Sequence, residues 1–407
     1  MLRNLHPDEA VRIVVEEAKR AWPSPRVERV PLAAAAGRAL VGAVASPIDH
    51  PPFDKSAMDG FAYAGPAPDG VYEVIDAVAA GRRSAAAVSP GKAIRIMTGA
   101  PIPAGTAGIQ RVEWTEAAGR AASGAELVHF TIREKIDNII RRGENLKAGE
   151  ELLSPRILAP QDIGILAASG CAEVEVAARP RVGVVSTGDE IEAAGSPLGE
   201  ASIYDSNGPQ LAAQAAAAGC EVRFYGIARD IAGELAAVLE RALAENDLVL
   251  VSGGVSMGDF DLVPAVLSNL GVEPIFHSLA MRPGKPTFFG RRGNSAVFGL
   301  PGNPVSTFVN FEVLAKRYLW AMMGLAGEPA VVRARLGAPL SRKAADRVEF
   351  LPARLFPGDG GMIAEPLAYH GSSMINVLAR ADALLRMEID VRTIGEGTIV
   401  DARRIRA

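Results

Sequence analysis

The fold is decided by the stretch RVGVVSTGDEI (residues 181–191), in which an apolar run ends in hydroxyl, glycine and acidic residues. The same kind of run recurs as DLVLVSGG (247–254) and SAVFGLPGN (295–303), with helical patterns between the runs. Continuous apolar strands that alternate with helices indicate a parallel sheet covered by helices on both faces. We therefore expect a three-layer α/β/α domain over residues 178–326.

The other elements of this domain follow in alternation. We expect strands at 221–228, 272–280 and 286–290, and helices near 207–219, 231–245, 262–270 and 304–323.

The flanks of this domain carry a different pattern. Short β-rich runs punctuated by Gly and Pro predict a β-rich insert domain over residues 47–145. Residues 1–46, with a helix from Pro7 to about Arg20, and residues 146–177, with a short helix, would together form a connecting module. A β-rich C-terminal domain is expected over 327–407, with strands at 331–336, 347–356, 361–368, 383–389 and 397–404.

Composition excludes several classes of protein. The 407 residues carry a formal net charge of −4, without the basic excess of a nucleic-acid binder. No apolar run is long enough to span a membrane, and the N-terminus lacks the apolar core of a signal peptide. Cys171 and Cys220 lie far apart, which favours reduced thiols over a disulfide or zinc site. We therefore expect a cytoplasmic protein that binds a small molecule or another protein, and neither nucleic acid nor membrane.

Candidate binding residues follow the ends of the predicted strands, where ligands of open parallel sheets bind. Glycine permits positive φ and close approach, so successive N–H groups can cradle a phosphate. Pro304 suits the first position of a helix and Asn303 its cap, which adds an anion site. The candidates are Ser186, Thr187, Gly188, Ser252, Gly253, Gly254, Ser256, Pro301, Gly302, Asn303 and Ser306.

Charged residues stand at the same strand ends. Arg282 and Lys285 add positive charge that suits an anion. Carboxylates repel phosphate, and they are explained as ligands of Mg²⁺. The candidate acids are Asp189, Glu190, Asp205, Asp230, Asp259 and Asp261. Taken singly, an acid is better explained by a cap or a surface position and a glycine loop by a turn, and PGNP is as well explained by a helix start, but their occurrence together at one sheet edge predicts a binding site.

Two further candidates lie outside the α/β domain. Asp59 stands in SAMDGFA (56–62) beside a glycine, and Thr98 stands in IMTGAPIPAG (96–105) after a predicted strand. A simple turn explains each of them locally. Spacing alone does not connect either residue with the α/β site.

These segments together resemble the molybdopterin molybdenumtransferase family, which includes bacterial MoeA proteins and the E domain of gephyrin. Besides the two segments just quoted, the motifs are RRGEN (141–145), STGDEI (186–191), YDSN (204–207), SGGVSMGDFD (252–261), RPGKP (282–286) and GLPGNPVS (299–306). They occur in the family's order and cover nearly the whole chain.

The resemblance implies four domains, of which the last is β-barrel-like, and a homodimer whose active site is shared between subunits. It implies an enzyme that inserts molybdate into adenylyl-molybdopterin with release of AMP and needs Mg²⁺. By position, Asp59, Thr98, Glu190, Asp230 and Asp261 correspond to functional residues, and the last three would hold the metal. Transient contacts with other cofactor-synthesis proteins or with acceptor molybdoenzymes are also expected.

Three positions depart from the family pattern. Asn145 stands where Asp is common, Ser278 where a bacterial relative places Lys, and Arg282 where Lys precedes PGKP. Arg offers a planar fork of donors to a tetrahedral oxyanion. Arg282 is therefore predicted to bind molybdate, and its loss would raise the half-saturating molybdate concentration by about 10- to 150-fold.

Other functions remain open at this stage. The adenylyltransferase of the preceding step uses a similar α/β domain, but it would not need the insert or the C-terminal β domain. A non-enzymatic scaffold would keep the fold without needing the acids, which are present here. Tungstate has the same charge as molybdate and nearly the same size, so the sequence does not separate the two.

Overall fold

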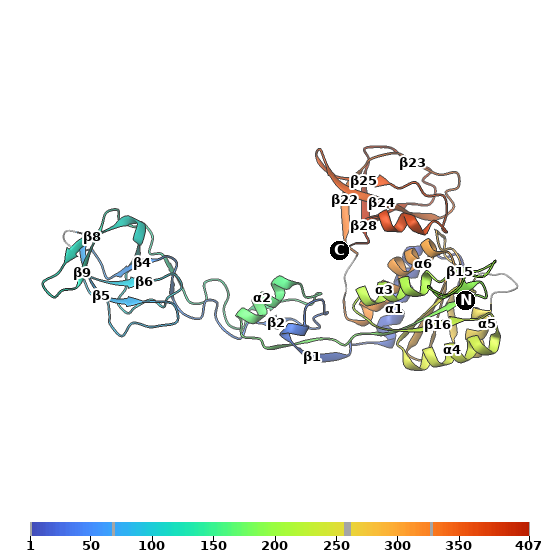
Figure 1. Cartoon of the computed structure of the whole chain (residues 1–407), viewed down its shortest axis with the longest axis horizontal. Coiled ribbons are helices and arrows are strands. Elements are labelled where there is room, and N and C mark those ends of the chain that lie inside the picture. Colours follow the sequence, from blue (N-terminus) through green and yellow to red (C-terminus); the bar gives the residue numbers. More distant parts are fainter. Residues whose placement is uncertain (1, 67–69, 256–261, 326–328, 407) are drawn as a thin grey trace. The chain divides into compact units, whose positions relative to one another are not determined.

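The computed structural model describes residues 2–66, 70–255, 262–325 and 329–406. The chain forms two compact units. The first contains Met1–Arg29, Gly37–Val41 and Glu175–Ala407, and the second contains Val30–Ala36 and Gly42–Val174. Figure 1 shows the elements of each unit. The two units are described separately below.

The first unit is built on a six-stranded sheet with the order β16-β13-β17-β21-β20-β18. Its strands are β13 (Arg181–Thr187), β16 (Glu221–Ala228), β17 (Leu248–Ser252), β18 (Glu273–Phe276), β20 (Phe288–Arg292) and β21 (Ser295–Leu300). The four strands β16, β13, β17 and β21 are parallel, as predicted.

The other two strands of the sheet, β18 and β20, break the parallel pattern. β20 pairs antiparallel with both β21 and β18. Only Gly293 and Asn294 separate β20 from β21, and so short a connection joins antiparallel neighbours, because a parallel pair needs a long crossover. β18 consequently runs in the same direction as β21, and its carboxyl end lies at the same sheet edge.

Helices cover both faces of the sheet, which confirms the three-layer prediction (Figure 1). One face packs on α3 (Asn207–Ala217) and α6 (Pro304–Asn310), and the other on α4 (Ala232–Glu245) and α5 (Val263–Asn269). The alternation of side chains along a strand explains the two cores: Val184 belongs to the first and Val185 to the second.

The helix expected near 304–323 is interrupted. α6 passes into a π-helical segment, Phe311–Ala315, and then into α7 (Lys316–Met322). Within this segment Glu312 is buried, and its carboxylate accepts hydrogen bonds from Gln214 Nε2 (3.0 Å) and Lys316 Nζ (2.9 Å). The N-terminal helix α1 (Pro7–Ala21) adds Ala10 and Val14 to the same core.

The C-terminal part of this unit is a closed barrel. Its strands are β22 (Val331–Leu336), β24 (Val348–Gly358), β25 (Gly361–Pro366), β26 (Ala383–Met387) and β28 (Ile399–Arg404). They pair in a ring, since β24 contacts both β25 and β26 while β22 and β28 complete the circle. The barrel-like prediction is thereby confirmed. The short strands are β19 (Met281–Arg282), β23 (Leu340–Ser341), β27 (Thr393–Ile394), and, before the barrel, β14 (Ile191–Glu192) and β15 (Ile203–Tyr204).

The second unit contains another six-stranded sheet, with the order β7-β4-β6-β5-β9-β8. Its strands are β4 (Gly60–Tyr63), β5 (Val71–Val78), β6 (Lys92–Ile96), β7 (Gly108–Arg111), β8 (Thr115–Arg120) and β9 (Glu126–Phe130). The unit also contains β2 (Val44–Ala45), β3 (Lys55–Ser56), β10 (Ile139–Ile140), β11 (Glu151–Leu153) and α2 (Pro160–Ala168). Two strands, β1 (Val27–Pro31) and β12 (Glu173–Ala177), contain residues of both units. β4 and β8 were not predicted, because the first is short and the second carries mostly exposed residues.

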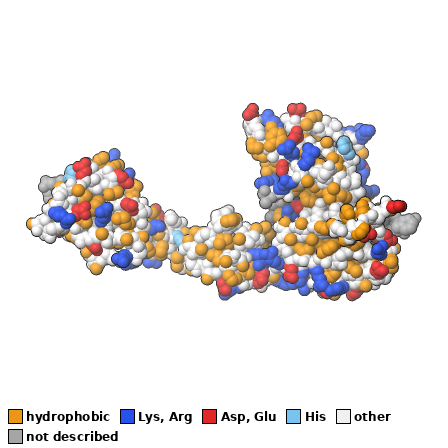
Figure 2. Space-filling model, in the orientation of Figure 1, with side chains coloured by type: hydrophobic (Ala, Val, Ile, Leu, Met, Phe, Trp, Pro, Cys, Tyr) orange, Lys and Arg blue, Asp and Glu red, His pale blue; other side chains and the backbone are white. Residues whose placement is uncertain are grey.

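The surface agrees with the composition. On the face shown in Figure 2, Lys and Arg side chains lie interspersed with Asp and Glu and form no continuous basic stripe. In the described ranges no helix is both long and apolar enough to cross a membrane.

Candidate functional site

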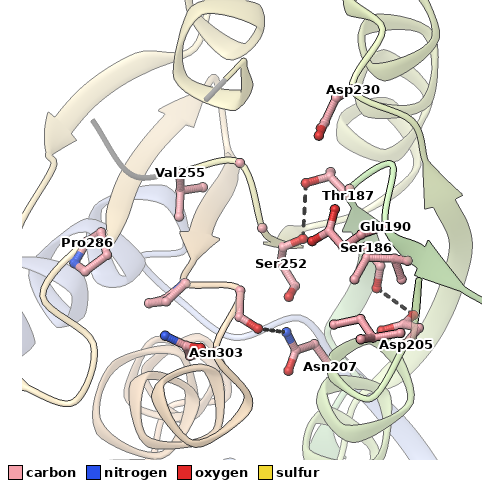
Figure 3. Close-up of a pocket in the computed structure, with 17 residues that line it drawn as sticks. Ser186, Thr187, Glu190, Asp205, Asn207, Asp230, Ser252, Val255, Pro286 and Asn303 are labelled. Atoms are coloured by element: carbon pink, nitrogen blue, oxygen red, sulfur yellow. Dashed lines mark hydrogen bonds between the residues drawn. The ribbon is translucent and has the colours of Figure 1, made fainter. Parts of the chain in front are cut away.

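Four parallel strands end around one pocket of about 500 Å³, which we call the glycine-loop pocket (Figure 3). The predicted residues that line it are Ser186, Thr187, Gly188, Glu190, Asp205, Asp230, Ser252, Gly253, Gly254, Pro301, Gly302 and Asn303. The rule that ligands bind beyond the carboxyl ends of parallel strands therefore locates a real cavity in this sheet.

The loop after β17 requires glycine at two positions. Gly253 and Gly254 have φ values of 95° and 60°, which other residues rarely adopt. A Cβ on Gly253 would lie 2.5 Å from the carbonyl oxygen of Thr187. This close approach, together with the hydrogen bond from Thr187 Oγ1 to Ser252 O (3.3 Å), holds the ends of β13 and β17 side by side.

Asp205 stabilises the pocket wall from within. It is buried, and its carboxylate accepts hydrogen bonds from Ser186 Oγ (2.8 Å) and from the backbone N–H of Gly208 (2.9 Å). Gly208 belongs to the first turn of α3, so this carboxylate caps the helix and ties it to β13. Asp205 therefore has a structural role at this edge, and its role in binding stays a prediction.

A row of amides on α3, which sequence reasoning missed, supports the loop after β21. Asn207 Nδ2 donates to Gly302 O (2.7 Å), Gln210 Nε2 to Pro304 O (3.2 Å) and Gln214 Nε2 to Phe308 O (3.4 Å). The spacing of three and four residues places all three amides on one helix face. That periodic signal was available in the sequence, but only the packing of α3 on α6 shows what it contacts.

Two of the predicted metal ligands line the glycine-loop pocket, namely Glu190 and Asp230. The backbone N–H of Asp230 donates to Asp189 Oδ1 (3.2 Å), which holds the loops after β13 and β16 together. Asp261, the third predicted ligand, lies outside the described residues, as do Ser256 and Asp259. Within the part of the chain that the structure describes, no group of three or more His, Cys, Asp or Glu side chains is placed to hold a metal ion.

Arg282 and Lys285 line a second pocket of about 490 Å³, which we call the cationic pocket. It lies between the α/β sheet and the barrel, and Ser306 lines it from α6. The barrel side contributes Arg347, Glu349, Tyr369, His370 and Ser372, none of which was predicted. Pro286, Pro301 and Asn303 line both pockets, which are therefore adjacent.

Two neighbours modify the charge of the cationic pocket. Arg282 Nη1 lies 4.0 Å from Glu349 Oε1, so part of the positive charge is compensated. Burial, reinforced by the charge of Glu349 and opposed by that of Arg282, raises the pKa of Tyr369 to about 12. Tyr369 is consequently a neutral phenol at physiological pH.

The remaining predicted residues meet within the second unit. Asp59 Oδ1 accepts hydrogen bonds from the backbone N–H of Thr98 (2.6 Å) and from its hydroxyl (2.7 Å). These two bonds lower the pKa of Asp59, which is therefore ionised at neutral pH. The structure thus brings together two residues that are far apart in the sequence.

An open α/β sheet with glycine-rich loops at its carboxyl edge defines a class of domains that bind phosphorylated small molecules. Family models for the MoeA N-terminal region (domain I and II), a "Probable molybdopterin binding domain" and the MoeA C-terminal region (domain IV) match residues 5–170, 183–320 and 333–403.

Individual relatives agree with these models. The chain is 36% identical to molybdopterin molybdenumtransferase 2 of Mycobacterium tuberculosis, over 95% of this chain and 96% of the relative. It is 32% identical to the molybdopterin molybdenumtransferase of Staphylococcus epidermidis, over 90% and 88%. A crystal structure of a molybdopterin biosynthesis MoeA protein from Pyrococcus horikoshii is similar with a TM-score of 0.81 at 28% identity, over 99% of this chain and 100% of that chain. The chain belongs to the MoeA family, which confirms the resemblance.

Proposed function

We propose that this protein is a molybdopterin molybdenumtransferase, which inserts molybdate into adenylyl-molybdopterin and releases AMP. The observation that carries the proposal is the adjacency of two pockets with different chemistry. The glycine-loop pocket offers backbone donors to a phosphorylated pterin, and the cationic pocket offers fixed positive charge to a tetrahedral dianion. The names of the relatives support the same reaction.

The phosphates of the substrate are assigned to the glycine-loop pocket. The loops at Gly253–Gly254 and Pro301–Asn303 leave their backbones close to the cavity, since a glycine presents no side chain to a ligand. Ser252 lines the same cavity, and its hydroxyl is the kind of group that binds phosphate oxygens. The hydroxyls of Ser186 and Thr187 also line it, but they already donate to Asp205 and to Ser252 O.

Mg²⁺ fits this pocket better than the cationic one. Glu190 and Asp230 supply carboxylate oxygens beside the proposed phosphate site, and Asp261 is proposed as a third ligand. Mg²⁺ prefers such oxygens together with water and phosphate. When bound, it would polarise the phosphoanhydride as a Lewis acid. Glu190 and Asp230, in the loops that follow β13 and β16, would hold the metal beside the phosphoanhydride.

Molybdate is assigned to the cationic pocket, which Arg282 lines from the end of β19 and Lys285 from the turn between β19 and β20. A Cβ on Gly284 would lie 2.1 Å from Asn310 Nδ2, so this turn packs tightly on α6 and its backbone is held in place. Thr287 Oγ1 lies 2.9 Å from Gly284 O and 2.8 Å from Asn310 Oδ1, and its single hydroxyl proton is donated to one of these two oxygens, which further stabilises the turn.

We also propose a homodimer with shared active sites, to which Asp59 and Thr98 contribute from the partner subunit. Mixing an Asp59→Ala subunit with an Asp230→Ala subunit would leave one intact site in each mixed dimer. We expect partial recovery of AMP release. Confirmed subunit exchange without any recovery would contradict sites built from two subunits.

We place the protein in the cytoplasm, where its free thiols Cys171 and Cys220 would stay reduced. Transient contacts with other cofactor-synthesis proteins or acceptor molybdoenzymes would then deliver substrate and remove product. Cross-linking in cell extract would check these contacts.

The decisive experiment incubates the protein with adenylyl-molybdopterin, Mg²⁺ and molybdate, and follows AMP and active cofactor. We expect AMP release that depends on both ions. A parallel incubation with ATP and molybdopterin tests the adenylyltransferase alternative. Absence of AMP release in the first reaction, with tight pterin binding intact, would instead favour a scaffold.

A further inference from the structure

The glycine loop that follows β17 is anchored at its first two residues by the backbone. The N–H of Gly253 donates to Leu300 O (3.0 Å), and Gly254 O accepts from the backbone N–H of Val263 (3.2 Å). Glycine has more conformational freedom than any other residue, so two consecutive glycines keep one conformation only where such bonds fix them. The residue that follows, Val255, is anchored in a different way.

The carbonyl oxygen of Val255 is bonded to the side chain of His277, with 2.8 Å between the oxygen and Nε2. A carbonyl oxygen only accepts, so Nε2 carries the proton and donates it. His277 is 6% exposed, and water therefore does not readily replace this donor. The third residue of the loop thus depends on a side chain, which a substitution can remove.

The loop reaches His277 by crossing the carboxyl edge of the sheet. β21 and β20 lie between β17 and β18, which puts the ends of the latter two roughly 14 Å apart at about 4.8 Å per strand. On the way Val255 packs against β21, where a Cβ on Gly299 would lie 2.7 Å from Val255 Cγ1. His277, directly after β18, therefore holds the loop from the far side of the sheet.

His277 is itself fixed from two directions. Its backbone N–H donates to Leu2 O (3.0 Å), and the N–H of Leu2 donates to Ile275 O (3.0 Å), so the segment after β18 pairs with the N-terminal segment. Its ring meets that of Phe288 edge-on, with 6.0 Å between the ring centres. A donor with a fixed backbone and a fixed ring selects one position for the carbonyl that it binds.

This anchor bears on the glycine-loop pocket. Val255 lines the pocket with Gly253 and Gly254, and Figure 3 shows it across the pocket from Glu190. His277 stands behind this wall and does not line the pocket itself. A ligand that binds the backbone of a loop gains affinity where the loop already has its bound conformation, because less conformational freedom is then lost on binding.

We propose that His277 is a positioning residue, which by holding Val255 O keeps the glycine loop in the conformation that binds the phosphates of the substrate. The proposal rests on the proposed function, which assigns those phosphates to this loop. His277 acts through the loop and contacts neither the substrate nor the reacting atoms.

The test removes the donor and then restores it. His277→Leu leaves a buried carbonyl oxygen without a partner, whereas His277→Gln offers an amide N–H in about the same place. The probe is AMP, the nucleotide part of the proposed substrate, and its binding to the full-length protein is measured calorimetrically. We expect AMP affinity to fall about 5- to 20-fold in His277→Leu and to return to within about twofold of the unmodified protein in His277→Gln.

Asn246→Ala is the matched control for lost stability. Asn246 is also buried, and its amide donates to Tyr225 Oη (2.7 Å) and to Ala242 O (2.9 Å), but it stands before β17, at the opposite edge of the sheet. We expect it to lower the melting temperature as His277→Leu does, with AMP affinity unchanged. If the role of His277 were stability alone, His277→Leu would bind AMP as this control does.

A measurement without ligand separates this proposal from the proposed function. Amide hydrogen exchange at Gly254 and Val255 should become about 5- to 20-fold faster in His277→Leu but not in His277→Gln, because only the first variant releases the loop. Equal AMP affinity of His277→Leu and Asn246→Ala, or an equal loss in the two His277 variants, would overturn the positioning role. If the unmodified protein released no AMP in the complete reaction, the proposed function would fail, and hydrogen exchange would still decide whether His277 holds the loop.

Discussion

The glycine-loop pocket and the cationic pocket share a wall but are built in different ways. The first takes most of its residues from the strand ends and adjoining loops of the α/β sheet, and it presents backbone groups, hydroxyls and the three carboxylates of Glu190, Asp205 and Asp230. The second joins the turn at Arg282–Lys285 to side chains of the barrel, and it presents cations and a neutral phenol. Shape and backbone donors suit a large ligand with phosphates, whereas fixed charge suits a small free dianion.

Because of this difference, the requirement of the proposed reaction for Mg²⁺ and its requirement for molybdate are expected to have separate structural origins. Acids beside a phosphate site need a cation between them and the ligand, while Arg282 and Lys285 need none. Mg²⁺ dependence should therefore belong to the first pocket, and molybdate dependence to the second. The following variants test that separation in order of expected effect.

Glu190→Gln should have the largest effect. It keeps the shape of a side chain that lines the glycine-loop pocket but removes a charge that a metal requires. We expect AMP release at limiting Mg²⁺ to fall about 10²- to 10³-fold, with calorimetric molybdate binding unchanged. Glu200→Gln, at an exposed acid between β14 and β15, is the control and should behave as the unmodified protein. Normal turnover of Glu190→Gln at limiting Mg²⁺ would remove Glu190 from the metal site.

Gly253→Ala should come next. The added Cβ meets Thr187 O at 2.5 Å on a backbone with φ of 95°, so the loop must move. Strain of about 1–3 kcal/mol predicts that affinity for adenylyl-molybdopterin falls roughly 5- to 150-fold. The half-saturating molybdate concentration should stay the same. A change in molybdate requirement with unchanged pterin affinity would show that the pockets are not separable in this way.

Arg282→Ala should act on the other pocket. Arg282 is partly exposed and lies 4.0 Å from Glu349, both of which weaken a hydrogen bond from its guanidinium to molybdate. We therefore expect the lower end of the range of about 10- to 150-fold that a charge-assisted hydrogen bond predicts. The half-saturating molybdate concentration should rise about 10-fold, with pterin affinity unaffected. A molybdate titration of AMP release measures it. Loss of pterin affinity with an unchanged molybdate requirement would assign Arg282 to the phosphate site.

Thr98→Val should have the smallest effect, in the other unit. It removes the hydroxyl that helps to lower the pKa of Asp59, so this pKa should rise toward its ordinary value of 3.8. Because the folded-state pKa is lowered, the interaction stabilises the fold above pH 3.8 and is lost as the pH falls through the lowered value. Carboxyl NMR of Asp59 measures the shift. An unchanged pKa would leave the backbone N–H of Thr98 as its sole cause.

The sequence by itself determined the elements and one sheet edge. Local patterns carry this information: apolar runs of five to seven residues formed β13, β17 and β21, Pro7 and Pro304 began helices, and five β-rich runs became the barrel. Since parallel strands end at a common edge, the residues after them could be grouped without coordinates. The glycine-loop pocket follows from that rule.

Only the tertiary structure decided the rest. An apolar run has no direction, so the runs at 286–290 and 295–300 are grouped with the parallel strands by pattern alone, and the pairing of β20 with β21 shows that these two are antiparallel. Arg347 and Tyr369 line the same pocket as Arg282 because the barrel packs on the α/β sheet. The backbone N–H of Asn4 donates to Ser278 Oγ, although the two residues are 274 positions apart. Contacts between distant segments depend on how whole elements pack, and a periodic pattern within one segment contains no record of its neighbours.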